Sequence, residues 1–131
     1  MLKRVSTGNA PAAIGPYSQA IDAGGMLFCS GQVGIDPATK KLAGGIEAQT
    51  EQALRNLAAV LQAAGSSMAD VVKTTLWLTD AADFAAVNAV YARHFGEPAP
   101  ARSAPVVVAI PLPGALISIE AIAVRSAARS Q

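Results

Sequence analysis

The sequence carries little charge and few aromatic side chains. Charged residues make up 15% of the 131 residues and aromatic residues 5%, and ten basic residues nearly balance nine acidic ones, for a net charge of +1. A nucleic-acid-binding surface needs clustered basic residues, and single-stranded RNA also needs aromatic rings for stacking. The basic residues here are scattered apart from short pairs. We therefore expect no nucleic-acid partner.

The sequence also lacks the residues of several common chemistries. Cys29 is the only cysteine and His94 the only histidine, which excludes an internal disulfide and a multi-histidine metal site. Phosphate-binding glycine loops and the Gly-x-Ser-x-Gly motif are absent. No apolar run approaches the ~18 to 20 residues that cross a bilayer, and residues 1–6 have no apolar stretch typical of a signal peptide. We expect a cytoplasmic protein with no metal and no membrane partner.

Apolar residues are abundant instead. They make up 52% of the chain, which predicts a globular single domain over residues 1–131. A surface with so little charge is often covered by another subunit, and closed homo-oligomers are the commonest way to cover it. Composition therefore favours an oligomer.

Hydrophobic periodicity predicts an α+β fold. Apolar residues recur every three or four positions in two segments, which predicts helices over residues 46–64 and 80–95. Alternating or β-branched segments predict five strands, over residues 17–22, 26–30, 71–78, 103–110 and 116–124. The last two strands are joined by a short turn, so we expect them to pair antiparallel. Two helices at these positions would cover one face of a single mixed sheet, and residues 126–131 would fray.

Two charged residues stand near the C-terminal end in apolar surroundings. Glu120 lies in a predicted strand that is apolar on both faces, where a carboxylate is costly unless it is paired or reaches a cleft. Arg102 stands at the start of a Val-rich segment, and its planar guanidinium is suited to gripping a substrate carboxylate. A structural ion pair for Glu120 and a plain surface position for Arg102 are the alternatives. The pair predicts a small-molecule site.

Two further segments offer polar or flexible positions. Tyr17 follows Gly15-Pro16 and could present its hydroxyl to a ligand or pack its ring. Ser30 ends a predicted strand, and Gly31 would let a ligand approach the backbone closely. A simple turn is the alternative at that position. Cys29, in an apolar strand with no neighbouring base, is expected to be a core residue.

Taken together, these motifs resemble a known family. The matching segments are residues 15–20 (Gly-Pro-Tyr-Ser-Gln-Ala), 30–32 (Ser-Gly-Gln), 72–75 (Val-Lys-Thr-Thr), 87–88 (Val-Asn), 100–103 (Pro-Ala-Arg-Ser) and 119–123 (Ile-Glu-Ala-Ile-Ala). They occur in order over almost the whole chain and resemble the reactive intermediate deaminase family (RidA, also called YjgF). The resemblance implies a chorismate-mutase-like α+β fold, a homotrimer with a β core, and sites in the clefts between subunits.

The resemblance also implies an activity without a cofactor. It is the hydrolysis of enamines and imines such as 2-aminoacrylate, 2-iminopropanoate and 2-iminobutanoate to 2-keto acids and ammonia. By this resemblance, Arg102 binds the substrate carboxylate, Glu120 activates water, and Tyr17, Ser30 and Gly31 hold the substrate or the water. Phe84 and Asn88 would line the cleft.

One departure from the resemblance lies next to the arginine. Many bacterial relatives have a cysteine where this chain has Ala104, which excludes a thiol role at that position. Imine hydrolysis needs no covalent nucleophile, so the predicted activity stands. The alternatives are a non-catalytic ligand-binding or holdase trimer and a ribonuclease.

Overall fold

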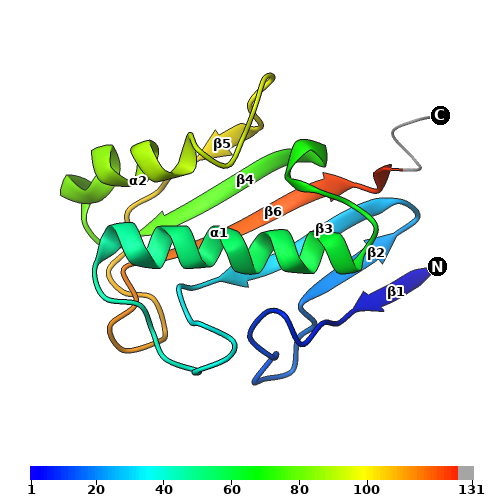
Figure 1. Ribbon diagram of the computed structural model, residues 1–131, viewed down its shortest axis with the longest axis horizontal. Helices are drawn as coiled ribbons and strands as arrows, with labels where there is room; N and C mark the ends of the chain where they lie inside the picture. The colour runs from blue at the N-terminus through cyan, green and yellow to red at the C-terminus, as the bar shows by residue number, and fades with distance from the viewer. Residues whose placement is uncertain (127–131) are drawn as a thin grey trace.

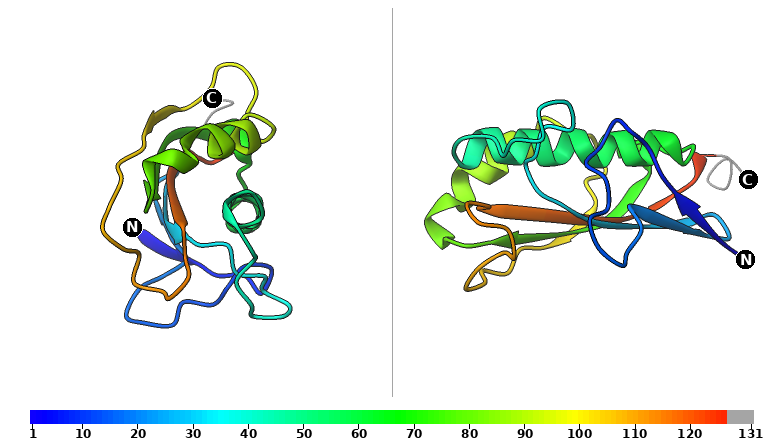
Figure 2. Two further views of the ribbon diagram at one scale, coloured as in Figure 1. Left: turned by 90° about the vertical axis from the view of Figure 1, so that its left-hand side faces the viewer. Right: turned by 90° about the horizontal axis from the view of Figure 1, so that it is seen from below.

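The computed structural model describes residues 1–126, which form a six-stranded mixed sheet with two α-helices on one face (Figure 1, Figure 2). The elements in chain order are β1 (Leu2–Val5), β2 (Ala20–Ala23), β3 (Met26–Gln32), α1 (Ile46–Ala63), η1 (Met68–Asp70), β4 (Val71–Leu78), η2 (Ala81–Asp83), α2 (Phe84–Tyr91), β5 (Ala101–Ser103) and β6 (Ile117–Val124). The α+β prediction, with one sheet and two helices on one side, is confirmed.

The last strand of the chain lies in the middle of the sheet. The strand order is β1-β2-β3-β6-β4-β5, with β4 and β5 parallel and all other neighbours antiparallel. Along β6 the odd-numbered residues Ile117 to Ala123 are buried, and the even-numbered residues between them are half-buried. Because successive side chains of a strand point to opposite faces, the odd positions pack under the helices and the even positions lie on the other face.

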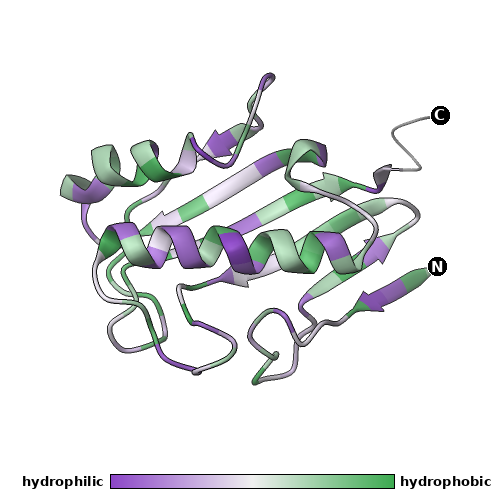
Figure 3. Ribbon diagram, viewed as in Figure 1, coloured by the Kyte–Doolittle hydropathy of each residue, from purple (hydrophilic) through white to green (hydrophobic). Residues whose placement is uncertain are grey.

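Helix α1 supplies much of the core beneath it. Leu54, Leu57 and Leu61 recur at three- and four-residue spacing and are fully buried in the same apolar cluster as Ile117 and Ile119 of β6. Figure 3 shows hydrophobic and hydrophilic residues alternating along this helix. Each such leucine stabilises the fold by about 1.5–3 kcal/mol relative to an exposed position.

Glycines form two of the turns. Gly65 has a φ of +76° just after α1, a backbone conformation that favours glycine and ends the helix. Gly24 and Gly25, with φ values of +66° and +98°, connect β2 to β3 in a tight turn between two antiparallel strands.

The prediction of a strand over residues 103–110 is wrong, and so is its antiparallel pairing with the last strand. The strand is β5, which ends at Ser103 and pairs parallel with β4. Beyond it, one bridge joins Val106 to Leu78, and Val108 is fully exposed. Pro105 has no N–H to contribute to a ladder. In addition, β3 and β4 already flank β6 on both sides, so β6 has no free edge for another strand.

Several boundaries differ from the predicted ones. Strand β1 was not predicted, because four residues with two adjacent basic side chains give too weak a signal. Strand β2 begins at Ala20, which leaves Tyr17 in a loop. Helix α2 ends at Tyr91 and is followed by turns up to residue 94, so the predicted helix was too long.

The end of β6 is tied to the turn after α1. Ser126 N donates to Gly65 O at 3.1 Å, and its Oγ lies 2.7 Å from Oδ2 of the buried Asp70. The hydroxyl of Ser66 also donates to the backbone oxygen of Val124, at 2.6 Å. Of the tail that was expected to fray, Ser126 therefore has partners, and residues 127–131 lie outside the described residues.

The face of the sheet opposite the helices carries exposed apolar side chains. Met26 and Phe28 of β3 are 37% and 47% exposed, and Val72 of β4 is 43% exposed. Exposed apolar residues that gather on one face commonly mark a contact surface. Glu120 of β6 lies on this same face.

Candidate functional site

Arg102 lies at the edge of the sheet, beside helix α2. Its Nη1 donates a hydrogen bond of 2.8 Å to Oδ1 of Asn88. The central carbon of its guanidinium lies 5.4 Å from the ring centroid of Phe84 and 5.0 Å from that of Tyr91. Both distances are within the range of a cation–π interaction. Three side chains of one helix therefore hold the guanidinium of an exposed arginine.

Tyr91 links this cluster to the core. Its hydroxyl lies 2.8 Å from Oγ1 of Thr74, a fully buried residue of β4 that is paired in register with Arg102. Burial raises the pKa of Tyr91, while the Thr74 hydrogen bond and the positive charge of Arg102 act in the opposite direction. The phenol therefore stays neutral at physiological pH, and its ring has a fixed position against the guanidinium.

Glu120 lies on the opposite face of the sheet from Arg102. Its neighbours Ile119 and Ala121 are buried beneath the helices, so its own side chain points to the other side. There its Oε1 accepts a hydrogen bond of 2.9 Å from the indole Nε1 of Trp77 on β4. The partner that makes this carboxylate tolerable is therefore an indole N–H and not an arginine.

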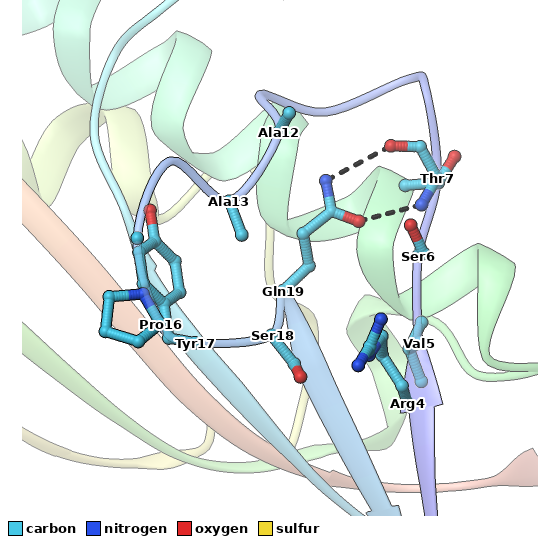
Figure 4. A pocket seen from close by; sticks show the side chains of 11 residues that line it. Arg4, Val5, Ser6, Thr7, Ala12, Ala13, Pro16, Tyr17, Ser18 and Gln19 are labelled. Atoms are coloured by element: carbon cyan, nitrogen blue, oxygen red, sulfur yellow. Dashed lines mark hydrogen bonds between the residues drawn. The ribbon is translucent and has the colours of Figure 1, made fainter.

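The loop that carries Tyr17 is held by the buried side-chain amide of Gln19, which lies between this loop and Thr7 (Figure 4). The Gln19 side chain is 4% exposed; its Oε1 accepts from Thr7 N at 2.7 Å, and its Nε2 donates to Thr7 O at 3.1 Å and Pro11 O at 2.8 Å. Ser30 adds a further tie, because its Oγ donates to the backbone oxygen of Ser18 at 2.6 Å.

Tyr17 borders two cavities. One has a volume of about 590 Å³ and is lined by the loop and by residues 4–7, as Figure 4 shows. The other has a volume of about 630 Å³, and Gly31 and Ser118 line it together with Tyr17. A Cβ on Gly31 would lie 2.6 Å from Oγ of Ser118, so glycine allows this hydroxyl to approach the β3 backbone. Ser118 is two residues before Glu120 and shares its face of β6.

The predicted site residues thus fall into two groups within one chain. Arg102, Asn88 and Phe84 come together at the helix side of the sheet edge. Tyr17 and Gly31 meet at the larger cavity, next to Ser118. Ser30 anchors the Tyr17 loop through Ser18, and Glu120 lies on the same face as Ser118. No contact joins the Arg102 group to Glu120 among the interactions of residues 1–126.

Sequence reasoning missed three residues that hold these groups. Tyr91 was predicted as part of an apolar helix face, and its three-residue spacing from Asn88 was the available signal. Gln19 lies in the matching segment 15–20, but the sequence predicted no role for it. Trp77 was predicted as a strand residue; its bond to Glu120, 43 positions away, could not be foreseen without the strand pairing.

The remaining reactive side chains lie away from both groups. Cys29 is buried in the core on the helix side of β3, which confirms the prediction of a core residue, and burial raises the pKa of its thiol from 9.0 to about 12. His94 Nε2 lies 2.8 Å from Oε1 of Glu51 on α1. Within residues 1–126 no three His, Cys, Asp or Glu side chains gather in a way that could hold a metal ion, and no helix has the length and apolar character needed to span a membrane.

Known proteins resemble this chain over nearly its full length. The family model described as endoribonuclease L-PSP matches residues 7–125. A mouse (Mus musculus) protein named 2-iminobutanoate/2-iminopropanoate deaminase is 48% identical over 124 residues, which cover 94% of this chain and 91% of the mouse protein. The crystal structure of RidA from the Antarctic bacterium Psychrobacter superimposes with a TM-score of 0.90 at 45% identity, covering 93% and 98% of the two chains. That of E. coli TdcF with bound serine gives a TM-score of 0.87 at 41% identity, covering 95% and 99%.

Proposed function

The chain belongs to the endoribonuclease L-PSP family, and we propose that it hydrolyses enamines and imines of small 2-amino acids to 2-keto acids and ammonia. The substrates would be 2-aminoacrylate with its tautomer 2-iminopropanoate, and 2-iminobutanoate. The name of the mouse relative supports this reaction, and the serine bound in the E. coli TdcF structure supports a small ligand related to amino acids.

The observation that carries the proposal is the arrangement around Arg102. A guanidinium offers five N–H donors in a planar fork, and Asn88 accepts from one nitrogen while two rings restrain the plane. A substrate carboxylate would bind this fork bidentately. Because the group is already ordered, little side-chain entropy is lost on binding.

Glu120 would act on water. In the reaction its carboxylate accepts a proton from water as the oxygen attacks the imine carbon, and the nitrogen takes up the electron pair of the C=N bond. That proton then passes to the nitrogen, which gives a carbinolamine with a hydroxyl and an amino group on one carbon. Glu120 would next accept the hydroxyl proton and pass it to the amino nitrogen as the C–N bond breaks, so that ammonia leaves and the oxygen forms the keto group. General acid–base help of this kind is typically worth ~10²- to 10⁴-fold. Tyr17 and Gly31, at the cavity beside Ser118, would hold the substrate or the water.

The complete site would be shared between subunits. Arg102 and Glu120 lie on opposite faces of one sheet, so one chain does not supply both to one small molecule. The exposed apolar residues on the Glu120 face favour covering by a second copy of the chain. We propose a homotrimer in which Arg102, Asn88 and Phe84 of one subunit face Glu120, Tyr17, Ser30 and Gly31 of the next.

The test uses a pyridoxal-phosphate enzyme that releases 2-aminoacrylate from serine, with keto-acid release followed in the presence of the purified protein. We expect the wild type to accelerate release and Arg102→Ala to return it to the spontaneous rate, with light scattering showing the same oligomer for both. Accelerated release by Arg102→Ala would refute the carboxylate anchor. If 2-oxobutanoate binds to the wild type but release is not accelerated, the protein is a non-catalytic ligand-binding member.

The family description also names a ribonuclease activity, and the same preparation tests it. The net charge of +1 and the scattered basic residues argue against an RNA groove. We expect no cleavage of single-stranded RNA by the purified oligomer. Salt-sensitive RNA binding together with cleavage that co-purifies with the oligomer would contradict this expectation.

A further inference from the structure

Within residues 1–126, the indole of Trp77 is the group that donates a hydrogen bond to the Glu120 side chain. Its Nε1 donates to Oε1 at 2.9 Å, in a half-buried setting. On the sheet, Trp77 is the register partner of Ser118, and Thr75 is the register partner of Glu120. The indole therefore reaches diagonally between strands, a distance that aromatic side chains can span.

Among the described residues, those around the Trp77–Glu120 hydrogen bond leave Glu120 without an ion-pair partner and place it near two cavities. Trp77 and Ser118 together line a small cavity of about 230 Å³, and Ser118 also lines the larger cavity of Tyr17 and Gly31. Lys73, paired with Ile122, is the charged residue on the flanking strands that shares this face. No ion pair joins Lys73 to Glu120 within residues 1–126. The neutral indole N–H therefore fixes the carboxylate without neutralising it.

We propose that Trp77 is a positioning residue for Glu120, which holds one carboxylate oxygen so that the other is directed at the hydrolytic water. The inference rests on the proposed deaminase function. An indole N–H is a donor only, so it can hold Oε1 but cannot take the proton that Glu120 must accept. A carboxylate in one fixed rotamer delivers water in one geometry, and a misplacement of about 1 Å can cost on the order of 100-fold in rate.

The first test asks whether the contact exists in solution, independently of any activity. Trp77 is the only tryptophan, so indole-¹⁵N labelling of the oligomer gives a single side-chain N–H signal. We expect Glu120→Ala to shift this signal and to speed its exchange with solvent. The matched control is Glu51→Gln, which removes a carboxylate charge from helix α1 and should leave the signal in place. An indole signal that is unaffected by Glu120→Ala would overturn the proposal.

The second test separates positioning from a purely structural role. Trp77→Phe keeps an aromatic ring but removes the N–H, and we expect kcat to fall about tenfold, within the range that misplacement allows, while KM stays within about twofold because the Arg102 group is untouched. Glu120→Asp shortens the carboxylate by one methylene and withdraws it from the indole. In that background Trp77→Phe should change kcat by less than about twofold, as expected for two residues that act through one interaction.

The results that would overturn the positioning role of Trp77 differ from the result that would refute the deaminase function. Equal tenfold losses in the wild-type and Glu120→Asp backgrounds, or a rise in KM with unchanged kcat, would overturn the positioning role. Absence of deamination by the wild type would refute the proposed function itself. In that case the labelling experiment still decides whether Trp77 holds Glu120.

Discussion

Removal of the Gln19 side-chain amide tests how much its hydrogen bonds stabilise the Tyr17 loop and the fold. The change is Gln19→Ala, at a side chain that is 4% exposed and bonds to Thr7 N, Thr7 O and Pro11 O within 3.1 Å. Each such bond contributes about 0.5–1.5 kcal/mol net. The three together predict a loss of about 1.5–4.5 kcal/mol in the free energy of unfolding, and more where a buried backbone group is left without a partner.

Urea denaturation followed by circular dichroism measures the loss, with the slope of the transition checked for constancy. Gln62→Ala is the matched control, because Gln62 lies exposed on α1 and its removal should change stability by no more than about 0.5 kcal/mol. Keto-acid release measured on the folded variant should also fall, since the loop that carries Tyr17 loses its anchor. A change in stability equal to that of Gln62→Ala would refute the reasoning.

Two further predictions concern the arginine cluster and the helix contact. Tyr91→Leu should raise KM for the imine substrate with a smaller effect on kcat, because it removes a ring that lies 5.0 Å from the Arg102 guanidinium. Tyr91→Phe keeps the ring and should leave KM nearly unchanged, and steady-state kinetics of the wild type and the two variants measure both effects. The pKa of Glu51 is lowered from 4.5, mainly by the hydrogen bond with His94 and to a smaller extent by the contacts with Arg55. The ionised Glu51 carboxylate therefore stabilises the fold above pH 4.5, and this contribution is lost as the pH falls through the lowered pKa. Wild type should therefore be more stable than Glu51→Gln at pH 7, by a margin that shrinks in acid; a margin that is constant in urea titrations from pH 7 to pH 3 would contradict this.

Local patterns predicted most of the secondary structure. The spacing of Leu54, Leu57 and Leu61 predicts α1 to within a residue, because a helix must bury one continuous stripe. Composition alone failed over residues 103–110, where valines suggested a strand although the segment leaves the sheet after β5. The error arose because β-propensity describes a half-buried sheet surface, and Val108 lies fully in solvent.

The site was harder to predict than the fold. The sequence predicts that Arg102 and Glu120 serve one small-molecule site. The structure places them on opposite faces of the sheet. Arg102 pairs with Thr74, which is buried beneath the helices, whereas Glu120 pairs with Thr75, which points to the other face. A shift of one residue in register exchanges the faces, and neither composition nor spacing specifies register between strands far apart in sequence.

The most direct test of a site shared between subunits is complementation between two inactive variants. Arg102→Ala and Glu120→Gln are expressed together with different tags, and mixed oligomers are purified through both tags. In every mixed trimer that carries both tags, one of the three interfaces combines an intact Arg102 from one subunit with an intact Glu120 from the next, about a third of the interfaces. We predict keto-acid release by the mixed protein well above that of either variant alone. Release no faster than that of the separate variants would contradict the account.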